Sequence, residues 1–267
     1  MRFRPFLLLA LVVAAFGAAG GWWVMHSREA DAQTASAQDA GKRESALASQ
    51  LAGAGIDARQ RGAIEALVRA YILDHPEILP EAMDKLQARE AEARLVPLRG
   101  AIETPFPGAV LGNPAGKVTL VEFTDFACTY CRSSVGDVEA LLGANPDLRV
   151  VVRQLPIIAP ESEPAARMGL AAAAQGKYAA FHKAMFTGER PSTASIAAAA
   201  SAAGLDGSAA DAFIRESGVH QELERNLGLA RQLGIGGTPA WSVGGQLISG
   251  AVGREKLQQA INDARKG

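Results

Sequence analysis

The sequence is poor in cysteine, histidine and aromatic residues, and it has no excess of charge of either sign. It contains 2 cysteines, and its 4 histidines show no pairing at the spacing of a metal site. We therefore expect no metal site. Lysine plus arginine (27) almost balances aspartate plus glutamate (28), which excludes nucleic acid as a partner. Aromatic residues are 6% of a composition that is 48% hydrophobic, so the core must be mainly aliphatic.

Residues 1–26 have the pattern of an export signal. Arg2 and Arg4 precede an uncharged run over residues 5–25. This run is long enough to cross a bilayer as a tilted helix, with two tryptophans at the far interface. The alternative is a cleaved signal peptide, because the most apolar part, residues 6–16, is short and small residues follow it. We favour an uncleaved anchor, and in both cases the remaining chain is expected outside the cytoplasm, where disulfides form.

Two segments have the composition of connections. Residues 27–56 are rich in Ala, Ser, Gln and Gly without a sustained apolar period, which predicts a flexible tether. A part of this tether can extend a helix. Residues 97–107 contain three prolines and a glycine, which predicts a linker ahead of the main domain.

Residues 57–96 lie between these connections and predict a helical hairpin. Asp57 and Gln60 form a plausible N-terminal cap pair. Five apolar residues share one face of the first helix: Ile64, Leu67, Val68, Tyr71 and Ile72. Two short helices bury too little apolar surface to be stable alone. The stripe is therefore expected to pack on the main domain or on copies of itself, which makes a homo-oligomer possible.

The two cysteines follow directly on an apolar strand, in the stretch VEFTDFACTYCRSS at 121–134. Residues 118–123 predict a central strand, residues 131–142 a helix and residues 148–156 a second strand parallel to the first. This is a βαβ unit with a Cys-x-x-Cys motif at its strand-to-helix junction.

The rest of the chain completes an α/β domain. Residues 164–233 have helical periodicity interrupted by Gly and Pro, which predicts an inserted helical subdomain. Residues 240–243 and 246–249 predict two strands joined by a two-residue glycine turn, and an amphipathic helix follows Gly253.

The spacing of the cysteines favours redox chemistry. A thiolate attacks disulfides, and a helix N-terminus lowers the pKa of a thiol by stabilising its anion. Cys128 is therefore the candidate nucleophile, and Cys131, one turn into the helix, is the candidate resolving thiol. A zinc half-site would need two further ligands, and a structural disulfide across so short a loop would stabilise the fold little.

Other residues have two open interpretations. Glu122 interrupts the apolar strand: if it is buried, its pKa is raised and it can exchange a proton with Cys131, but it can equally face solvent at the strand end. His182 is expected in the core or at a groove edge, and Trp241 in a peptide groove or the core. Pro239 follows Thr238 before a strand, and about 5–6% of such bonds are cis.

This order of elements, with G-T-P before the hairpin at 237–239, resembles the DsbA-type branch of the thioredoxin superfamily. The resemblance implies that Cys128 is the nucleophile, Cys131 the resolving cysteine and Glu122 the family's buried acid. It implies that Pro239 is the cis-proline and that Thr238 offers backbone hydrogen bonds to a substrate peptide.

The resemblance covers roughly residues 105–265 of the predicted domain at 105–267, with one departure. Family members commonly carry Pro-His or Pro-Tyr between the cysteines, whereas this chain has Thr129 and Tyr130, which we expect to contact substrate. Without the histidine, a donor that stabilises the thiolate is missing. A second segment, YILDHPEILPEAMDKLQARE, resembles the N-terminal extension of copper-sensitivity suppressor C and related proteins, which implies a possible role in oligomers.

We therefore expect an exported thiol-disulfide oxidoreductase on the periplasmic side of a bacterial inner membrane. It would form or isomerise disulfides through a mixed disulfide on Cys128, without a bound cofactor. Its expected partners are unfolded or cysteine-containing exported proteins and a membrane redox partner. An oligomer built through residues 57–96 would favour isomerase activity. The alternative is a non-enzymatic module whose thiols bind Cu(I), because soft thiolates select that ion.

Overall fold

The computed structural model describes residues 42 and 45–266. The predicted anchor over residues 5–25 lies outside the described residues, as does most of the predicted tether. The chain divides into an N-terminal unit, which ends at Pro80, and a larger unit, which begins at Glu81. Among the described helices, none combines the length and the apolar character that a bilayer span requires.

The N-terminal unit contains helix α2 (Ala58–Asp74), and residues 45–53 before it are also helical. The predicted cap of α2 is confirmed, because the Gln60 backbone N–H donates to the Asp57 side chain at 2.8 Å and the Asp57 backbone N–H donates to the Gln60 side chain at 2.9 Å. Helix α2 buries none of its side chains, and α3 (Ile78–Leu95) follows it. Both predicted helices are present, and their packing as a hairpin stays a prediction.

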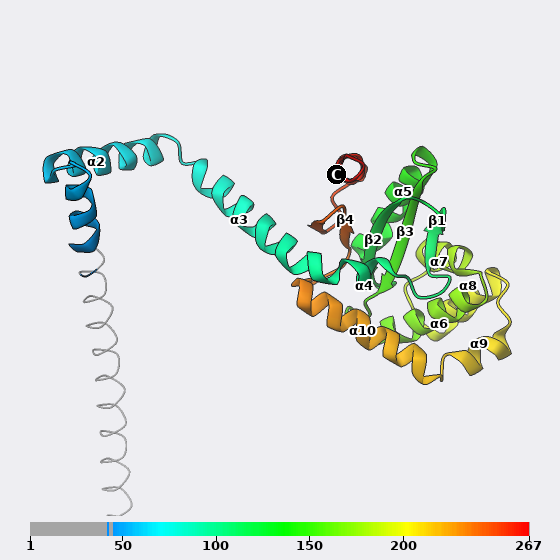
Figure 1. The fold of residues 1–267 in the computed structure, drawn as a ribbon. Coiled ribbons are helices and arrows are strands. Elements are labelled where there is room, and N and C mark those ends of the chain that lie inside the picture. The colour runs from blue at the N-terminus through cyan, green and yellow to red at the C-terminus, as the bar shows by residue number, and fades with distance from the viewer. Residues whose placement is uncertain (1–41, 43–44, 267) are drawn as a thin grey trace, which may run out of the picture. The chain divides into compact units, whose positions relative to one another are not determined.

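The larger unit is built on a mixed five-stranded sheet in the order β1-β3-β2-β4-β5 (Figure 1). The central strand β2 pairs in parallel with β3 and antiparallel with β4, as expected for a βαβ unit followed by a hairpin. The short edge strand β1 pairs antiparallel with β3 and was not predicted. The strands are β1 (Val110–Gly112), β2 (Val118–Thr124), β3 (Leu148–Gln154), β4 (Ala240–Val243) and β5 (Gln246–Ser249).

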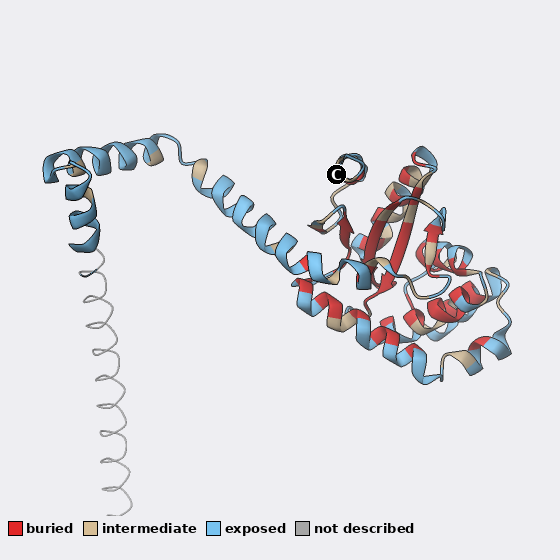
Figure 2. Cartoon of the chain, viewed as in Figure 1, coloured by how far each residue is buried: buried red, intermediate tan, exposed pale blue. Residues whose placement is uncertain are grey.

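Helices cover both faces of this sheet, so the strands β2, β3 and β4 are mostly buried, whereas the edge strands β1 and β5 are partly exposed (Figure 2). One face packs against α5 (Thr129–Ala144) and α11 (Arg254–Ala264). The opposite face packs against α4 (Arg99–Glu103) and α10 (Ser217–Leu233). Strand β2 is nearly continuous in apolar residues because both of its faces are covered.

Helices occupy the predicted insert between β3 and β4. They are α6 (Ser162–Ala174), α7 (Tyr178–Thr187), α8 (Thr193–Ala202), α9 (Gly207–Phe213) and α10. The hairpin β4–β5 turns at Gly244 and Gly245, whose φ angles of 56° and 90° fit the left-handed conformations of a tight two-residue turn. The predicted α/β class, the helical insert and the β-hairpin β4–β5 are therefore confirmed.

The prediction of a linker at residues 97–107 was wrong over its first part. The segment forms a 3-10 turn at Val96–Leu98 and then helix α4. Ile102 on α4 is completely buried, and it packs beside Leu95 in the core of the sheet. Tertiary packing stabilises this short helix, although its proline and glycine favour a loop.

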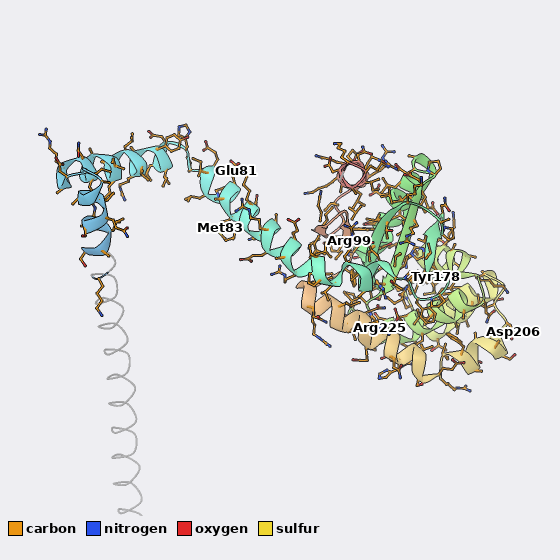
Figure 3. The ribbon with its side chains drawn as sticks, in the orientation of Figure 1. Glu81, Met83, Arg99, Tyr178, Asp206 and Arg225 are labelled. Atoms are coloured by element: carbon orange, nitrogen blue, oxygen red, sulfur yellow. The ribbon has the colours of Figure 1, made fainter. Side chains whose placement is uncertain are left out.

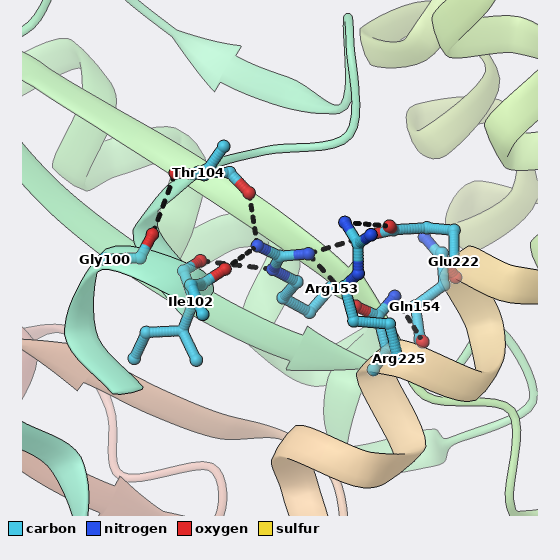
Figure 4. A network of polar contacts seen from close by, with 9 residues as sticks. Gly100, Ile102, Thr104, Arg153, Gln154, Glu222 and Arg225 are labelled. Atoms are coloured by element: carbon cyan, nitrogen blue, oxygen red, sulfur yellow. Dashed lines mark hydrogen bonds and ion pairs between the residues drawn. The ribbon is translucent and has the colours of Figure 1, made fainter. Parts of the chain in front are cut away.

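Arg153 on β3 ties α4 and α10 to the sheet (Figure 4). Its buried guanidinium donates to a Glu222 carboxylate oxygen at 2.8 Å and to the Asn226 side chain at 3.1 Å, both on α10. It also donates to the carbonyls of Ala101, Ile102 and Thr104. A buried cation is tolerated here because it has a paired anion and several acceptors.

We expect Arg153→Met to destabilise the larger unit strongly. The substitution leaves the Glu222 carboxylate buried without its main partner, and breaking such a pair costs about 3–5 kcal/mol. Chemical denaturation followed by circular dichroism measures the change. The matched control is Lys183→Met, which breaks the exposed Lys183–Glu139 ion pair and should change stability little. Equal effects of the two substitutions would show that Arg153 is not a structural anchor.

Candidate active site

The two cysteines lie at the junction between β2 and α5. Cys128 is the N-cap of α5, and its sulfur accepts a hydrogen bond from the Cys131 backbone N–H at 3.3 Å. The amide groups and the positive end of the helix dipole therefore face this sulfur. Cys128 therefore occupies the helix N-terminus, which is the geometry that the spacing of the motif predicted.

The two thiols differ in their surroundings. Both are free cysteines; Cys128 keeps 4% of its surface exposed, whereas Cys131 has none. Burial is the main cause that raises the pKa of Cys131 well above its usual range, and the nearby Glu122 charge raises it further. Cys131 therefore needs a proton acceptor before it can attack a disulfide, whereas Cys128 lies nearer to the solvent.

Thr238 and Pro239 lie beside Cys128, although they are far from it in the sequence. The Cys128 thiol donates to the Thr238 carbonyl at 3.2 Å, across 110 positions of sequence. The peptide bond between Thr238 and Pro239 is cis, as the resemblance implied. The backbone of Thr238 therefore lies directly beside the candidate nucleophile.

Glu122 is buried and does not face solvent. It retains 2% exposure, and one of its carboxylate oxygens, Oε2, has no hydrogen-bond partner. Burial raises the pKa of Glu122 to about 7, and the nearby Thr124 hydroxyl opposes this shift. The Glu122 charge helps to raise the pKa of Cys131. A carboxyl whose pKa is near neutral therefore acts electrostatically on the buried thiol.

Thr129 and Tyr130, between the cysteines, are exposed to solvent. Tyr130 has 67% of its surface exposed. The apolar residues Ile157 and Ile158 are also exposed, on the loop that follows β3. Their backbone N–H groups donate to the carboxylate of Asp125, three residues before Cys128, at 2.8 and 2.9 Å. The motif and this loop therefore lie next to each other.

Sequence reasoning missed Asp125 and Arg132, which hold the motif in place. The second carboxylate oxygen of buried Asp125 accepts from the Ala127 N–H at 2.8 Å, so this side chain shapes the turn before Cys128. The Arg132 guanidinium donates to carbonyls at the end of α7, among them Phe186 and Gly188. An aspartate directly after an apolar strand was a usable turn signal, whereas no local signal marked the role of the arginine.

Two residues with open interpretations belong to the core. Trp241 is fully buried, and its indole N–H donates to the Gly250 carbonyl at 2.9 Å. His182 is buried against the aromatic rings of Phe126 and Phe186, and burial lowers its pKa to about 4. In the described part of the chain, no three His, Cys, Asp or Glu side chains gather as a metal site.

Residues 119–262 match the DSBA-like thioredoxin domain, and residues 60–93 match the Copper resistance protein ScsC N-terminal domain. The first match spans more than half of the chain and includes the strand and helix that carry both cysteines. The second covers most of α2 and α3. Both resemblances drawn from the sequence are therefore confirmed.

Solved structures share this fold. A thioredoxin-like oxidoreductase from Silicibacter pomeroyi DSS-3 is 37% identical with a TM-score of 0.61, and the match covers 63% of this chain and 98% of that one. A linker-deletion mutant of Proteus mirabilis ScsC is 27% identical with a TM-score of 0.61, over 79% and 97% of the two chains. A periplasmic thioredoxin-like protein from Salmonella enterica serovar Typhimurium is 27% identical with a TM-score of 0.59, over 64% and 97%.

Curated relatives include sodium/proton antiporters. NhaA of Herminiimonas arsenicoxydans is 32% identical over 162 residues, which are 59% of this chain and 26% of the antiporter. NhaA 3 of Salinispora tropica is 28% identical, over 66% of this chain and 28% of the antiporter. The chain thus spans about a quarter of the length of the curated relatives it matches. The family match and the solved structures together show that the chain belongs to the DsbA-like thioredoxin family of thiol-disulfide oxidoreductases and carries a ScsC-type N-terminal domain.

Proposed function

We propose that this chain is an exported oxidoreductase that forms or isomerises disulfides in secreted proteins through a mixed disulfide on Cys128. The observation that carries the proposal is the contact between the Cys128 sulfur and the Thr238 carbonyl, with the sulfur at the N-terminus of α5. A client peptide that pairs with the Thr238 backbone would bring its own sulfur to Cys128. Cys131 is buried three positions further along the chain, on α5, where it can resolve the mixed disulfide.

The proposed chemistry covers both isomerisation and oxidation of a client. In isomerisation, the Cys128 thiolate attacks a client disulfide, forms a Cys128–client bond and releases the other client sulfur as a thiolate. In oxidation, a client thiolate attacks Cys128 of the oxidised Cys128–Cys131 pair and releases the Cys131 thiolate. A second client thiolate then attacks the client sulfur, forms the client disulfide and releases the Cys128 thiolate. Where no client thiol resolves the mixed disulfide, Cys131 must lose its proton and attack Cys128, which releases the client sulfur as a thiolate. Glu122 is the proposed proton acceptor for that step.

The surface around Cys128 suits an unfolded polypeptide. Tyr130, Ile157 and Ile158 are exposed apolar side chains beside the motif, and Thr129 adds a polar one. Scattered apolar contacts of this kind fit many client sequences, while hydrogen bonds to the Thr238 backbone do not depend on client side chains. We propose these residues as the client contact.

We propose that the chain works on the periplasmic side of a bacterial inner membrane, held by residues 5–25 or released after signal cleavage. The apolar N-terminal run supports export, and a similar solved structure is described as periplasmic. The two thiols require a compartment that permits disulfides. A membrane redox partner would restore the active redox state.

Helix α2 supports a further part of the proposal, a homo-oligomer. Its exposed apolar side chains include Ile64, Leu67, Val68 and Tyr71, about half or more of each being open to solvent. A face of this size rarely stays uncovered in water. A second copy of the same helix is the proposed partner, and several active sites around one client would favour isomerase activity.

We expect Leu67→Glu in α2 to lower the solution mass of the full chain to that of a monomer. A charge in an apolar contact is costly to bury, so the association should weaken. Light scattering coupled to size exclusion measures the mass, and Glu65→Gln on the same helix is the control. If the unmodified chain is already monomeric, the oligomer proposal is wrong while the redox proposal stands.

A client assay tests the redox proposal. The full chain is incubated with a reduced client and, separately, with a client whose disulfides are scrambled, and the recovered client activity is measured. We expect acceleration of at least one reaction. Acceleration of neither would contradict the proposal, and a preference for the scrambled client would identify an isomerase. Binding of Cu(I) by the same thiols, the alternative function, stays a prediction.

A further inference from the structure

A cluster of buried polar side chains lies on the face of the sheet that packs against α5. Glu122 and Thr124 are two positions apart on β2, so they share that face, and Gln154 on β3 is the register partner of Thr124. Oxygen atoms of all three side chains are buried without a hydrogen-bond partner: Oε2 of Glu122, Oγ1 of Thr124 and Oε1 of Gln154. Unpaired groups of this kind are costly to bury, which points to a functional use.

Tyr178, labelled in Figure 3, is the first residue of α7. Its phenol oxygen accepts a hydrogen bond from the Gln154 side-chain amide at 2.7 Å, and its ring is buried in the core of the same face. A phenol can accept and donate at once. The phenol oxygen of Tyr178 already accepts from the Gln154 amide, so Tyr178 can donate its hydroxyl proton to another group.

Glu122 is the acidic acceptor within electrostatic reach of that hydroxyl. The Glu122 charge adds to burial in raising the pKa of Tyr178, so the phenol stays protonated at physiological pH. No direct hydrogen bond joins the two side chains among the described residues, so the hydroxyl would act through its dipole or through one bridging water. Both routes favour the ionised carboxylate over the neutral acid.

The other elements packed on this face add few titratable groups. The pKa values of Cys131 on α5 and Tyr178 on α7 are both raised by the Glu122 charge. His182 on α7 lies against the Tyr178 ring, with ring centroids 5.7 Å apart, and burial lowers its pKa to about 4. The core of this face is otherwise apolar and includes Leu111 on β1, Trp241 on β4 and Ile261 on α11. No cation pairs with Glu122 in the described part of the chain, so neutral donors, of which the Thr124 hydroxyl is one, are left to stabilise its charge.

We infer that Gln154 and Tyr178 form a positioning pair, which stabilises the ionised form of Glu122 and thereby sets the pH at which Glu122 takes the proton from Cys131. This inference rests on the proposed function. In the step concerned, the S–H bond of Cys131 breaks and its proton moves to the Glu122 carboxylate. The freed electron pair forms the bond to the Cys128 sulfur, and the client sulfur leaves as a thiolate.

Stopped-flow reaction of the reduced full chain with an aromatic disulfide such as Ellman's reagent isolates this step. Attack by Cys128 releases one coloured thiolate, and the later attack by Cys131 releases a second in a phase that does not depend on reagent concentration. We expect the rate of the second phase to rise with pH through an inflection near neutral pH. In Tyr178→Phe, the inflection should move upward by about one pH unit, a tenfold change in proton affinity.

A double-mutant cycle separates this role from a structural one. In a Glu122→Gln background, Tyr178→Phe should leave the pH profile unchanged, because no carboxylate remains to be stabilised. Tyr71→Phe removes the same hydroxyl from exposed α2 and is the matched control. If Tyr178→Phe does not fold, Gln154→Met provides the second test: it weakens the phenol as a donor and should move the inflection in the same direction.

The inference is overturned if the Tyr178→Phe profile coincides with that of the unmodified chain, or if the rate falls equally at every pH. An equal shift in the Glu122→Gln background also overturns it. These results leave the proposed function intact. Failure of the proposed function would give a different result: Cys128→Ser would then retain its activity on clients.

Discussion

Cys128→Ser should lose the activity on reduced and scrambled clients, leaving the rate of the uncatalysed reaction. A serine hydroxyl does not form a disulfide, so no mixed disulfide can form at position 128. Cys131 cannot take over, because it is fully buried and its pKa is raised well above the usual range of a thiol. The time course of client reactivation measures the loss.

The fold of the variant is checked by its thermal unfolding, because serine at an N-cap keeps the helix start intact. Ser133→Ala, at an exposed position near the start of α5, is the matched control and should retain activity. Full activity in the Cys128 variant would refute the mechanism. A similar loss in both variants would assign the effect to helix geometry and not to the thiol.

Glu122→Gln should slow the attack by Cys131 and change the pH dependence of stability. The pKa of Glu122 is raised from 4.5 to about 7 in the folded chain. Between these values the folded state holds a proton that the unfolded state has released, so the free energy of unfolding falls as the pH rises from 4.5 to 7. A shift of this size corresponds to about 3 kcal/mol. The glutamine variant lacks this loss.

Denaturant titrations at pH 4.5 and pH 8 measure the difference between Glu122→Gln and the unmodified chain. We expect the variant to gain about 3 kcal/mol relative to the unmodified chain on going from the lower to the higher pH. Glu224→Gln, an exposed carboxylate on α10, should show no such gain. Parallel pH profiles for Glu122→Gln and the unmodified chain would mean that Glu122 titrates normally in the folded state.

Local patterns predicted much of the fold because they specify their own structure. The run VTLVEF is apolar at nearly every position, as a strand covered on both faces must be, and it forms β2. Asp57 and Gln60 satisfy each other's backbone groups without help from distant residues. Gly244 and Gly245 supply the conformations that a tight hairpin needs.

Features that depend on distant residues were not predictable. The linker prediction failed because Ile102 is buried and Arg153, some 50 positions away, binds the carbonyls of α4. Strand β1 has three residues and exists through its pairing with β3. The burial of Glu122 follows from the elements that cover β2, so the strand sequence left it undecided.

The candidate site shows the same division. The positions of Cys128 and Cys131 on α5 followed from their spacing after a strand. The family resemblance alone implied a role for Thr238 in binding a substrate peptide, because 110 positions separate it from Cys128. The bonds of Asp125 to the loop after β3 had no counterpart in the local sequence.

The most direct test of the central claim is to trap the mixed disulfide. In Cys131→Ser the resolving thiol is absent, so a client captured by Cys128 should stay covalently attached until a reductant is added. Incubation with a scrambled client, followed by non-reducing separation and mass spectrometry of the peptides, identifies the bond. A client cysteine joined to Cys128 is the predicted result. The absence of any adduct, while Cys131→Ser remains folded, would contradict the account.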